Sequence, residues 1–283
     1  MRVAMLVAVL GLVVPALPPP PPPPLLAAEI RVADFSVADL MQATALDLIF
    51  DQFGPAIAGS ARAGDISADK IFLRHWEAAA ASAFNGPALR SRLARSLDGR
   101  FSAGERAALG NFFRSDFGRR ISALEREVAR LGAEAQAVAL NEGEAFSKAA
   151  SPARSIQLDD LMDLMGTDIS GVMAGQSMRA LLLGMSVLHQ RGDIDVPWQE
   201  IDAQVEAMMP GLLADHTRAQ RAMMAYAYRE LSDRELDRYI IFLRTPPAQK
   251  LYAIAAYAVG QIAARSMVSF GEELAERMAS MNI

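Results

Sequence analysis

Apolar residues recur at three- and four-residue spacing along most of the chain after residue 28. Clear examples are the run at Leu236, Tyr239, Ile240 and Leu243 and the longer stripe that begins at Leu251. This spacing places apolar side chains on one face of an α-helix, whereas a β-strand would alternate apolar and polar residues. No stretch shows sustained alternation of the strand type. The pattern therefore predicts an all-α protein.

The first 28 residues have a different character. Arg2 precedes an almost unbroken apolar run over residues 3–17, and seven prolines follow at positions 18–24. The run has the length of a signal-peptide core and is short for a bilayer span, and polyproline cannot continue a helix. We predict a signal peptide over residues 1–28, cleaved after Ala28, and export to the periplasm or the medium. The alternative is an uncleaved N-terminal anchor, through which the protein would contact the membrane.

Composition narrows the chemistry. The chain has 283 residues, of which 52% are hydrophobic, so it can bury a sizeable core. It has no cysteine, which excludes disulfides, thiolate metal sites and thiol nucleophiles. His75, His189 and His216 are far apart and lack the spacing of a metal site. We therefore expect no metal, no cofactor and, given export, no nucleic-acid partner.

One segment of the first half recurs 130 positions later. Ser102 and Glu105 have the Ser-x-x-Glu spacing of a capping box, in which both side chains bind backbone groups at the start of a helix. Ser232 and Glu235 repeat this spacing. The matches continue downstream with Phe112, Ser115, Gly118 and Arg120 in the first half and Phe242, Thr245, Pro246 and Lys250 in the second.

Looser matches lie upstream of the capping boxes. They pair Asp39 with Asp160, Gly64 with Gly192, and Trp76 with Trp198. Because the order is the same in both halves, the matches favour an internal duplication. We predict two tandem, divergent helical modules of about five helices each. They occupy residues 29–140 and 158–283 and are joined by a linker at residues 141–157.

The repeated segment resembles a secreted bacterial all-α family that is classified as a domain of unknown function. Members of that family carry a Glu-Leu … Phe-x-x-Ser-Pro-x-Gly-x-Lys signature between two helices. The second half matches it at Glu235-Leu236, Phe242, Thr245-Pro246, Ala248 and Lys250, and the first half at Glu105, Phe112, Ser115, Gly118 and Arg120. Asp116 replaces the proline in the first half, and Ala248 replaces the glycine in the second. The resemblance implies an exported helical protein and no particular activity.

Two groups of residues are candidates for binding. Methionines are concentrated after residue 160, where they would either line an adaptable groove for an apolar peptide or lipid, or simply fill the core. The groove candidates are Met162, Met165, Met208, Met209, Met223 and Met224. The arginines from Arg90 to Arg130 would contact anionic lipid or envelope polymer. However, the interleaved Asp98, Glu125 and Glu127 favour a solvated face with ion pairs along the helix.

These observations predict a non-enzymatic, exported binding module of the bacterial envelope, with a protein, peptide or lipid as its partner. Two alternatives stay open. One is a hydrolase or other enzyme with an Asp, Glu and Arg site between the two modules, and the other is a purely structural envelope protein. No residue is assigned a catalytic role, and Ser115 has no neighbouring histidine to act as its base.

Overall fold

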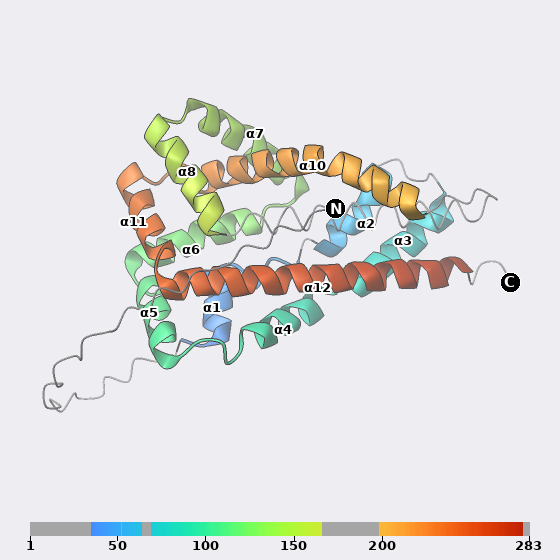
Figure 1. The fold of residues 1–283 in the computed structure, drawn as a ribbon, viewed down its shortest axis with the longest axis horizontal. Coiled ribbons are helices and arrows are strands. Elements are labelled where there is room, and N and C mark those ends of the chain that lie inside the picture. Colours follow the sequence, from blue (N-terminus) through green and yellow to red (C-terminus); the bar gives the residue numbers. More distant parts are fainter. Residues whose placement is uncertain (1–34, 52, 64–68, 166–197, 280–283) are drawn as a thin grey trace, which may run out of the picture. The chain divides into compact units, whose positions relative to one another are not determined.

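A computed structural model describes residues 35–51, 53–63, 69–165 and 198–279 of the chain (Figure 1). The described residues contain eleven α-helices and no strand, which confirms the predicted all-α class. All of these helices belong to one compact unit, residues 34–283. In chain order the helices are α1 (Val37–Ala43), α2 (Phe53–Ala63), α3 (Lys70–Ala83), α4 (Gly86–Leu97), α5 (Ala103–Phe113), α6 (Asp116–Ala129), α7 (Ala133–Ala149), α8 (Pro152–Leu164), α10 (Trp198–Ala227), α11 (Asp233–Leu243) and α12 (Pro246–Ala279).

Both predicted capping boxes are present at the starts of α5 and α11. The Ser102 hydroxyl accepts from the Glu105 backbone N–H, and the Glu105 carboxylate accepts from the Ser102 N–H at 2.8 Å. Ser232 and Glu235 make the same pair of bonds. Each box satisfies two backbone donors that a helix start would otherwise leave unpaired.

Replacing Ser232 with alanine should therefore destabilise the protein. Loss of an N-cap hydroxyl lowers the free energy of unfolding by about 0.5–2 kcal/mol. Thermal unfolding followed by circular dichroism measures this change as a lower melting temperature. Ser232→Thr, which keeps the hydroxyl, is the control, and an unchanged melting temperature in Ser232→Ala would contradict the role of the cap.

The helix boundaries repeat at the spacing seen in the sequence. α5 and α11 begin and end 130 positions apart, and so do the starts of α6 and α12. The end of α7 and the end of α12 keep the same spacing. The pair α6 and α7 thus covers the positions that α12 covers without interruption, with a break at residues 130–132.

The terminal helices pack against the opposite half of the chain. α12 packs along α3 and α4, whereas α7 packs along α10 (Figure 1). At the first contact the buried Trp76 of α3 meets Phe270 of α12 edge to face, with ring centroids 4.8 Å apart. At the second, Gly143 lies so close to α10 that a Cβ there would overlap the Ala222 carbonyl. One continuous core therefore includes residues from both halves.

α12 is the most apolar of the long helices. By length and composition its residues 246–278 would also suit a membrane span, but half of the most apolar window is buried inside the fold. Leu251, Ala255, Ala258 and Ile262 recur every three or four residues on its buried side. Within the described unit α12 is a core helix.

Several predicted elements have different bounds in the structure. The first half begins with two short helices, α1 and α2, and Pro55 lies in the first turn of α2, where it fits without a backbone donor. The predicted linker at residues 141–157 is mostly helical: it contains the end of α7 and the start of α8, with a break at residues 150–151. Gly64, Gly192 and the segment 166–197 lie outside the described residues.

Candidate functional site

The repeated phenylalanines meet each other across the two halves. Phe112 of α5 and Phe242 of α11 stack with ring centroids 3.5 Å apart and planes 4° apart. Tyr239 and Phe113 pack around them. Edge-to-face pairs such as Phe113 and Phe242, with centroids 5.4 Å apart, stabilise a fold beyond the area that they bury. The two phenylalanines of the signature therefore join the halves.

The repeated charged residues also pair across the halves. Arg120 donates to the Glu235 carboxylate at 2.5 Å, and Lys250 donates to that of Glu105 at 2.8 Å. Each half thus contributes one acidic and one basic residue, and the four residues form two equivalent ion pairs. The hydrogen bond from Lys250 lowers the pKa of Glu105, and the backbone bond from Ser232 lowers that of Glu235. Each glutamate therefore caps its own helix and also forms an ion pair with a basic residue of the other half.

The hydroxyl groups and the glycine of the signature stabilise the turn between two helices. Ser115 accepts from the Gly118 N–H and donates to the Phe112 carbonyl, and Thr245 donates to the Phe242 carbonyl in the same way. A Cβ on Gly118 would overlap the Phe112 carbonyl, so this turn requires glycine. The Ser115 hydroxyl is thereby held by backbone, and Pro246 starts α12. These contacts are structural.

The six candidate groove methionines are divided between the core and the surface. Met162 is buried, Met165 and Met224 pack against the core, and Met223 is half-buried. Met208 is exposed, and the side chain of Met209 is outside the described residues. Three of the six therefore contribute to the core, and the apolar groove stays a prediction.

A polar cluster lies between the halves, around Glu125 of α6. The hydroxyls of Tyr228 and Tyr239 donate to the same Glu125 oxygen at 2.8 and 2.6 Å. The Tyr252 hydroxyl lies 3.1 Å from that of Tyr239, and Met165 sulfur lies near Tyr228. Burial raises the pKa of Glu125 to about 6, although both hydrogen bonds favour the charged form. Burial, then the Glu125 charge, raises the pKa of each tyrosine.

This cluster has no counterpart at the positions 130 residues away. The positions 130 away from Glu125, Tyr239 and Tyr252 are Ala255, Leu109 and Ser122. Among the described residues, no second carboxylate is hydrogen-bonded into the cluster. A single carboxylate held by tyrosines lacks the acid and base pair that hydrolysis by two carboxylates needs. We interpret the cluster as a link between α6, α10, α11 and α12.

The strongest candidate site is a cleft between α4 and α12, which we call the arginine cleft. Asn85 caps α4, and Leu89, Leu93 and Leu97 bury one side of it in the core. This leaves Arg92, Arg95 and Ser96 on its outer sides, and Arg100 follows a turn at Gly99, whose φ of 67° favours glycine. α12 supplies the other wall and the floor, with Ile254, Tyr257, Ala258, Gln261, Ile262 and Arg265.

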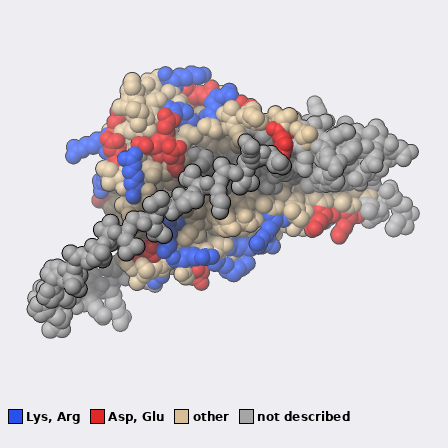
Figure 2. Space-filling model, in the orientation of Figure 1, with Lys and Arg blue, Asp and Glu red and all other residues tan. Residues whose placement is uncertain are grey.

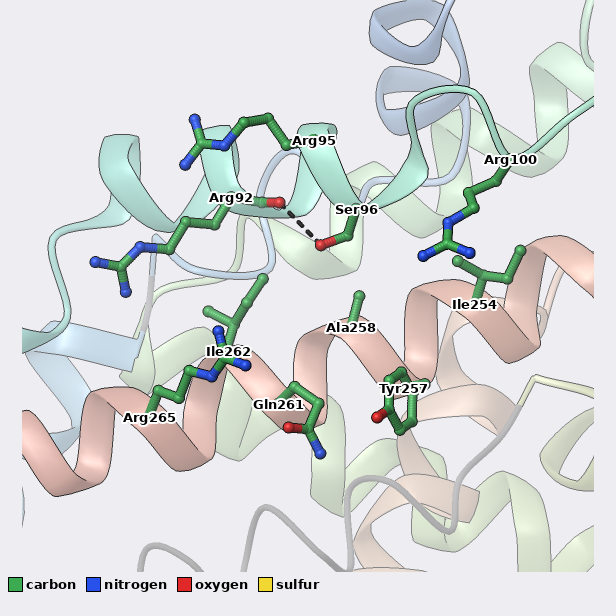
Figure 3. A pocket seen from close by; sticks show the side chains of 10 residues that line it. All are labelled: Arg92, Arg95, Ser96, Arg100, Ile254, Tyr257, Ala258, Gln261, Ile262 and Arg265. Atoms are coloured by element: carbon green, nitrogen blue, oxygen red, sulfur yellow. Dashed lines mark hydrogen bonds between the residues drawn. The ribbon is translucent and has the colours of Figure 1, made fainter.

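The cleft has a volume of about 470 Å³, which is within the usual range of small-ligand sites. Figure 3 shows Arg100 and Arg265 reaching into the space between the two helices. Arg92 lies along the same opening, whereas the guanidinium of Arg95 points away from α12. Ala258 and Ile262 are buried and form an apolar floor. The arrangement is an apolar trough with cationic groups at its rim.

The four arginines of the cleft differ from those arginines of the fold that pair with carboxylates. Arg126, for example, is paired with a carboxylate: it binds Asp47 with both terminal nitrogens. Within the described part of the chain, no carboxylate pairs with Arg92, Arg95, Arg100 or Arg265. Lys and Arg side chains gather along the lower edge of the face drawn in Figure 2, where Figure 1 places α4. Unbalanced positive charge in a cleft attracts anions.

The side chains that line the cleft are cationic, uncharged polar or apolar. Among the described residues, the cleft is lined by no acid, histidine or lysine, and arginine stays protonated, so no general base is at hand. Guanidinium groups bind carboxylate and phosphate through paired N–H donors. Among the same residues, no group of three or more His, Asp and Glu side chains suits a metal ion.

The sequence indicated only part of this site. Arg92, Arg95 and Arg100 belong to the basic stretch. An ion pair along the helix forms in that stretch between Arg119 and Asp116, but within the described residues none pairs with these three arginines. Glu125 is bound by tyrosines, and Glu127 lies near Arg229, in the turn after α10. The sequence pattern does not predict Arg265 or Tyr257 as site residues, although Arg265 is the only charged residue in the apolar stretch 251–271. Comparison of the chain with protein-family models, curated proteins and solved structures gives no match.

Proposed function

We propose that this protein is an exported, non-enzymatic binding protein that holds an anionic ligand in the arginine cleft. The observation that carries the proposal is the gathering of Arg92, Arg100 and Arg265 around one cavity, without carboxylate partners in the described residues. Like charges placed together lower stability when nothing balances them. A bound anion would supply the missing charge and form charge-assisted hydrogen bonds with the guanidinium groups.

Two further parts of the proposal concern origin and location. The matched helix ends, the stacked Phe112 and Phe242 and the two equivalent ion pairs support an internal duplication. The apolar run at residues 3–17 and the prolines after it support export. The resemblance to the secreted family of unknown function is consistent with both and adds no activity.

The anion proposal predicts a specific loss of binding on removal of cleft charge. Calorimetric titration with tripolyphosphate, citrate and trigalacturonate should show saturable binding of at least one, which weakens as salt rises. Arg100→Gln and Arg265→Gln should each reduce the affinity about tenfold or more, because a hydrogen bond to a charged group contributes about 1.5–3 kcal/mol.

Arg234→Gln is the matched control, because Arg234 is exposed on α11 and does not line the cleft. It should bind as the unaltered protein does. If none of the three anions binds, or if Arg234→Gln weakens binding as much as Arg265→Gln, the cleft is not the site.

A further inference from the structure

The charges of the arginine cleft are gathered at its two ends. α4 and α12 run in opposite directions along it, so that Arg92 lies opposite Ile262 and near Arg265, whereas Arg100 lies opposite Ile254 (Figure 3). Positions 254 and 265 of α12 are about 16 Å apart along the helix axis at 1.5 Å per residue. A compact anion such as orthophosphate would reach only one end. The two ends together match an elongated ligand that carries several negative charges.

The middle of the cleft is uncharged but able to form hydrogen bonds. Ser96 donates its proton to the Arg92 carbonyl at 3.0 Å, which leaves its oxygen free to accept from a ligand hydroxyl. Gln261 is exposed at the opening, and its amide both donates and accepts. These groups suit hydroxyls placed between the charged groups of a ligand.

Tyr257 supplies an aromatic surface at the same opening. Tyr257 is 71% exposed, on a helix whose other side lies in the core. The ring lines the cleft together with Ala258 and Ile254. Figure 3 shows it beside Gln261, at the edge of α12 that is turned away from α4. An exposed tyrosine offers a rigid, amphipathic face with little entropy to lose, against which the apolar face of a sugar ring can pack.

We infer that the ligand is an acidic oligosaccharide. Its carboxylates bind Arg92 and Arg265 at one end and Arg100 at the other, and its uncharged middle packs on Tyr257 and binds Ser96 and Gln261. This inference rests on the proposed anion-binding function and names the class of ligand for the same cleft. Polymers of uronic acids have the required elements, namely repeated carboxylates, hydroxyls and sugar faces.

Length dependence tests the inference. In calorimetric titrations of the full chain, affinity for oligogalacturonates should rise at least about tenfold from the monomer to the trimer, because a longer ligand engages both ends at once. It should then change little from the trimer to the pentamer. Neutral galacto-oligosaccharides of equal length should not bind measurably.

A tyrosine variant separates sugar recognition from charge. Tyr257→Ala should weaken trigalacturonate binding several-fold and leave tripolyphosphate binding unchanged, whereas Arg265→Gln should weaken both. Val268→Ala, which alters an exposed residue of the same helix outside the cleft, should change neither.

Three outcomes would overturn the inference. If tripolyphosphate binds as tightly as trigalacturonate, the cleft is still an anion site but does not recognise a sugar. Binding to phosphatidylglycerol vesicles without binding to oligogalacturonate would assign the cleft to a membrane surface. Absence of binding by every anion would remove the proposed function as well.

Discussion

Cutting the chain between Ala150 and Ser151 is expected to give two fragments that fold only together. The cut falls between the C-cap of α7 and the N-cap of α8, so it interrupts no helix. In each fragment, however, a long apolar surface that is buried in the intact chain would become exposed. The first loses α12 from α3 and α4, and the second loses α7 from α10.

The size of the effect follows from what these contacts bury. Without α12, Trp76 and the α4 leucines Leu93 and Leu97, all fully buried in the intact chain, would face water or collapse non-natively. Burial of a large apolar side chain contributes about 1.5–3 kcal/mol. A few such losses equal the whole stability of an ordinary domain, which is about 5–15 kcal/mol.

Circular dichroism of the separate and mixed fragments measures the outcome. We expect weak or non-cooperative thermal unfolding for each fragment alone and a cooperative transition after mixing in equal amounts. The control is the full-length chain with a protease site inserted at the same position. Its thermal unfolding is measured before and after cleavage. Cooperative unfolding of either fragment alone would instead support two independent modules, as the predicted boundaries at residues 140 and 158 imply.

Local features of the fold were predictable because their causes are local. Ser102 and Glu105 lie within one turn of the helix that they cap, so their spacing alone predicts the capping box. The pairing of α12 with the first half was not predictable in this way. The spacing of 130 residues pairs Phe112 with Phe242 in the sequence. It does not predict against which half of the chain each terminal helix packs. That choice depends on side-chain packing between segments far apart in the chain.

The arginine cleft shows the same limit. The basic stretch that contains Arg92 and Arg100 was visible, and the acids beside it favoured ion pairs along one helix. In the structure Arg126 binds Asp47 from a preceding segment, so ion pairing follows the tertiary fold. Arg265 joins the cleft from a helix more than a hundred residues later. No spacing in a single sequence joins two such positions.

Lowering the pH from about 7 to about 4 should stabilise the unaltered protein relative to Glu125→Gln. The folded protein raises the pKa of Glu125 from 4.5 to about 6, chiefly by burial. Below 4.5 the group is protonated in both the folded and the unfolded state and carries no penalty. As the pH rises through 6, the folded protein must hold a buried charge, and stability falls by about 2 kcal/mol at about 1.4 kcal/mol per pKa unit.

Glutamine at position 125 carries no charge at any pH, and its carbonyl oxygen still accepts from Tyr228 and Tyr239. Other carboxylates act in the opposite direction, since the pKa values of Glu105 and Glu235 are lowered and their stabilisation is lost in acid. These groups are common to both proteins, so they cancel when urea unfolding of the two is compared at each pH. The stability of the unaltered protein minus that of Glu125→Gln should therefore rise by about 2 kcal/mol between pH 7 and pH 4. Parallel curves would mean that the tyrosine hydroxyls and nearby water solvate Glu125 as well as bulk water does, and that the cluster is a simple hydrogen-bonded joint between the halves.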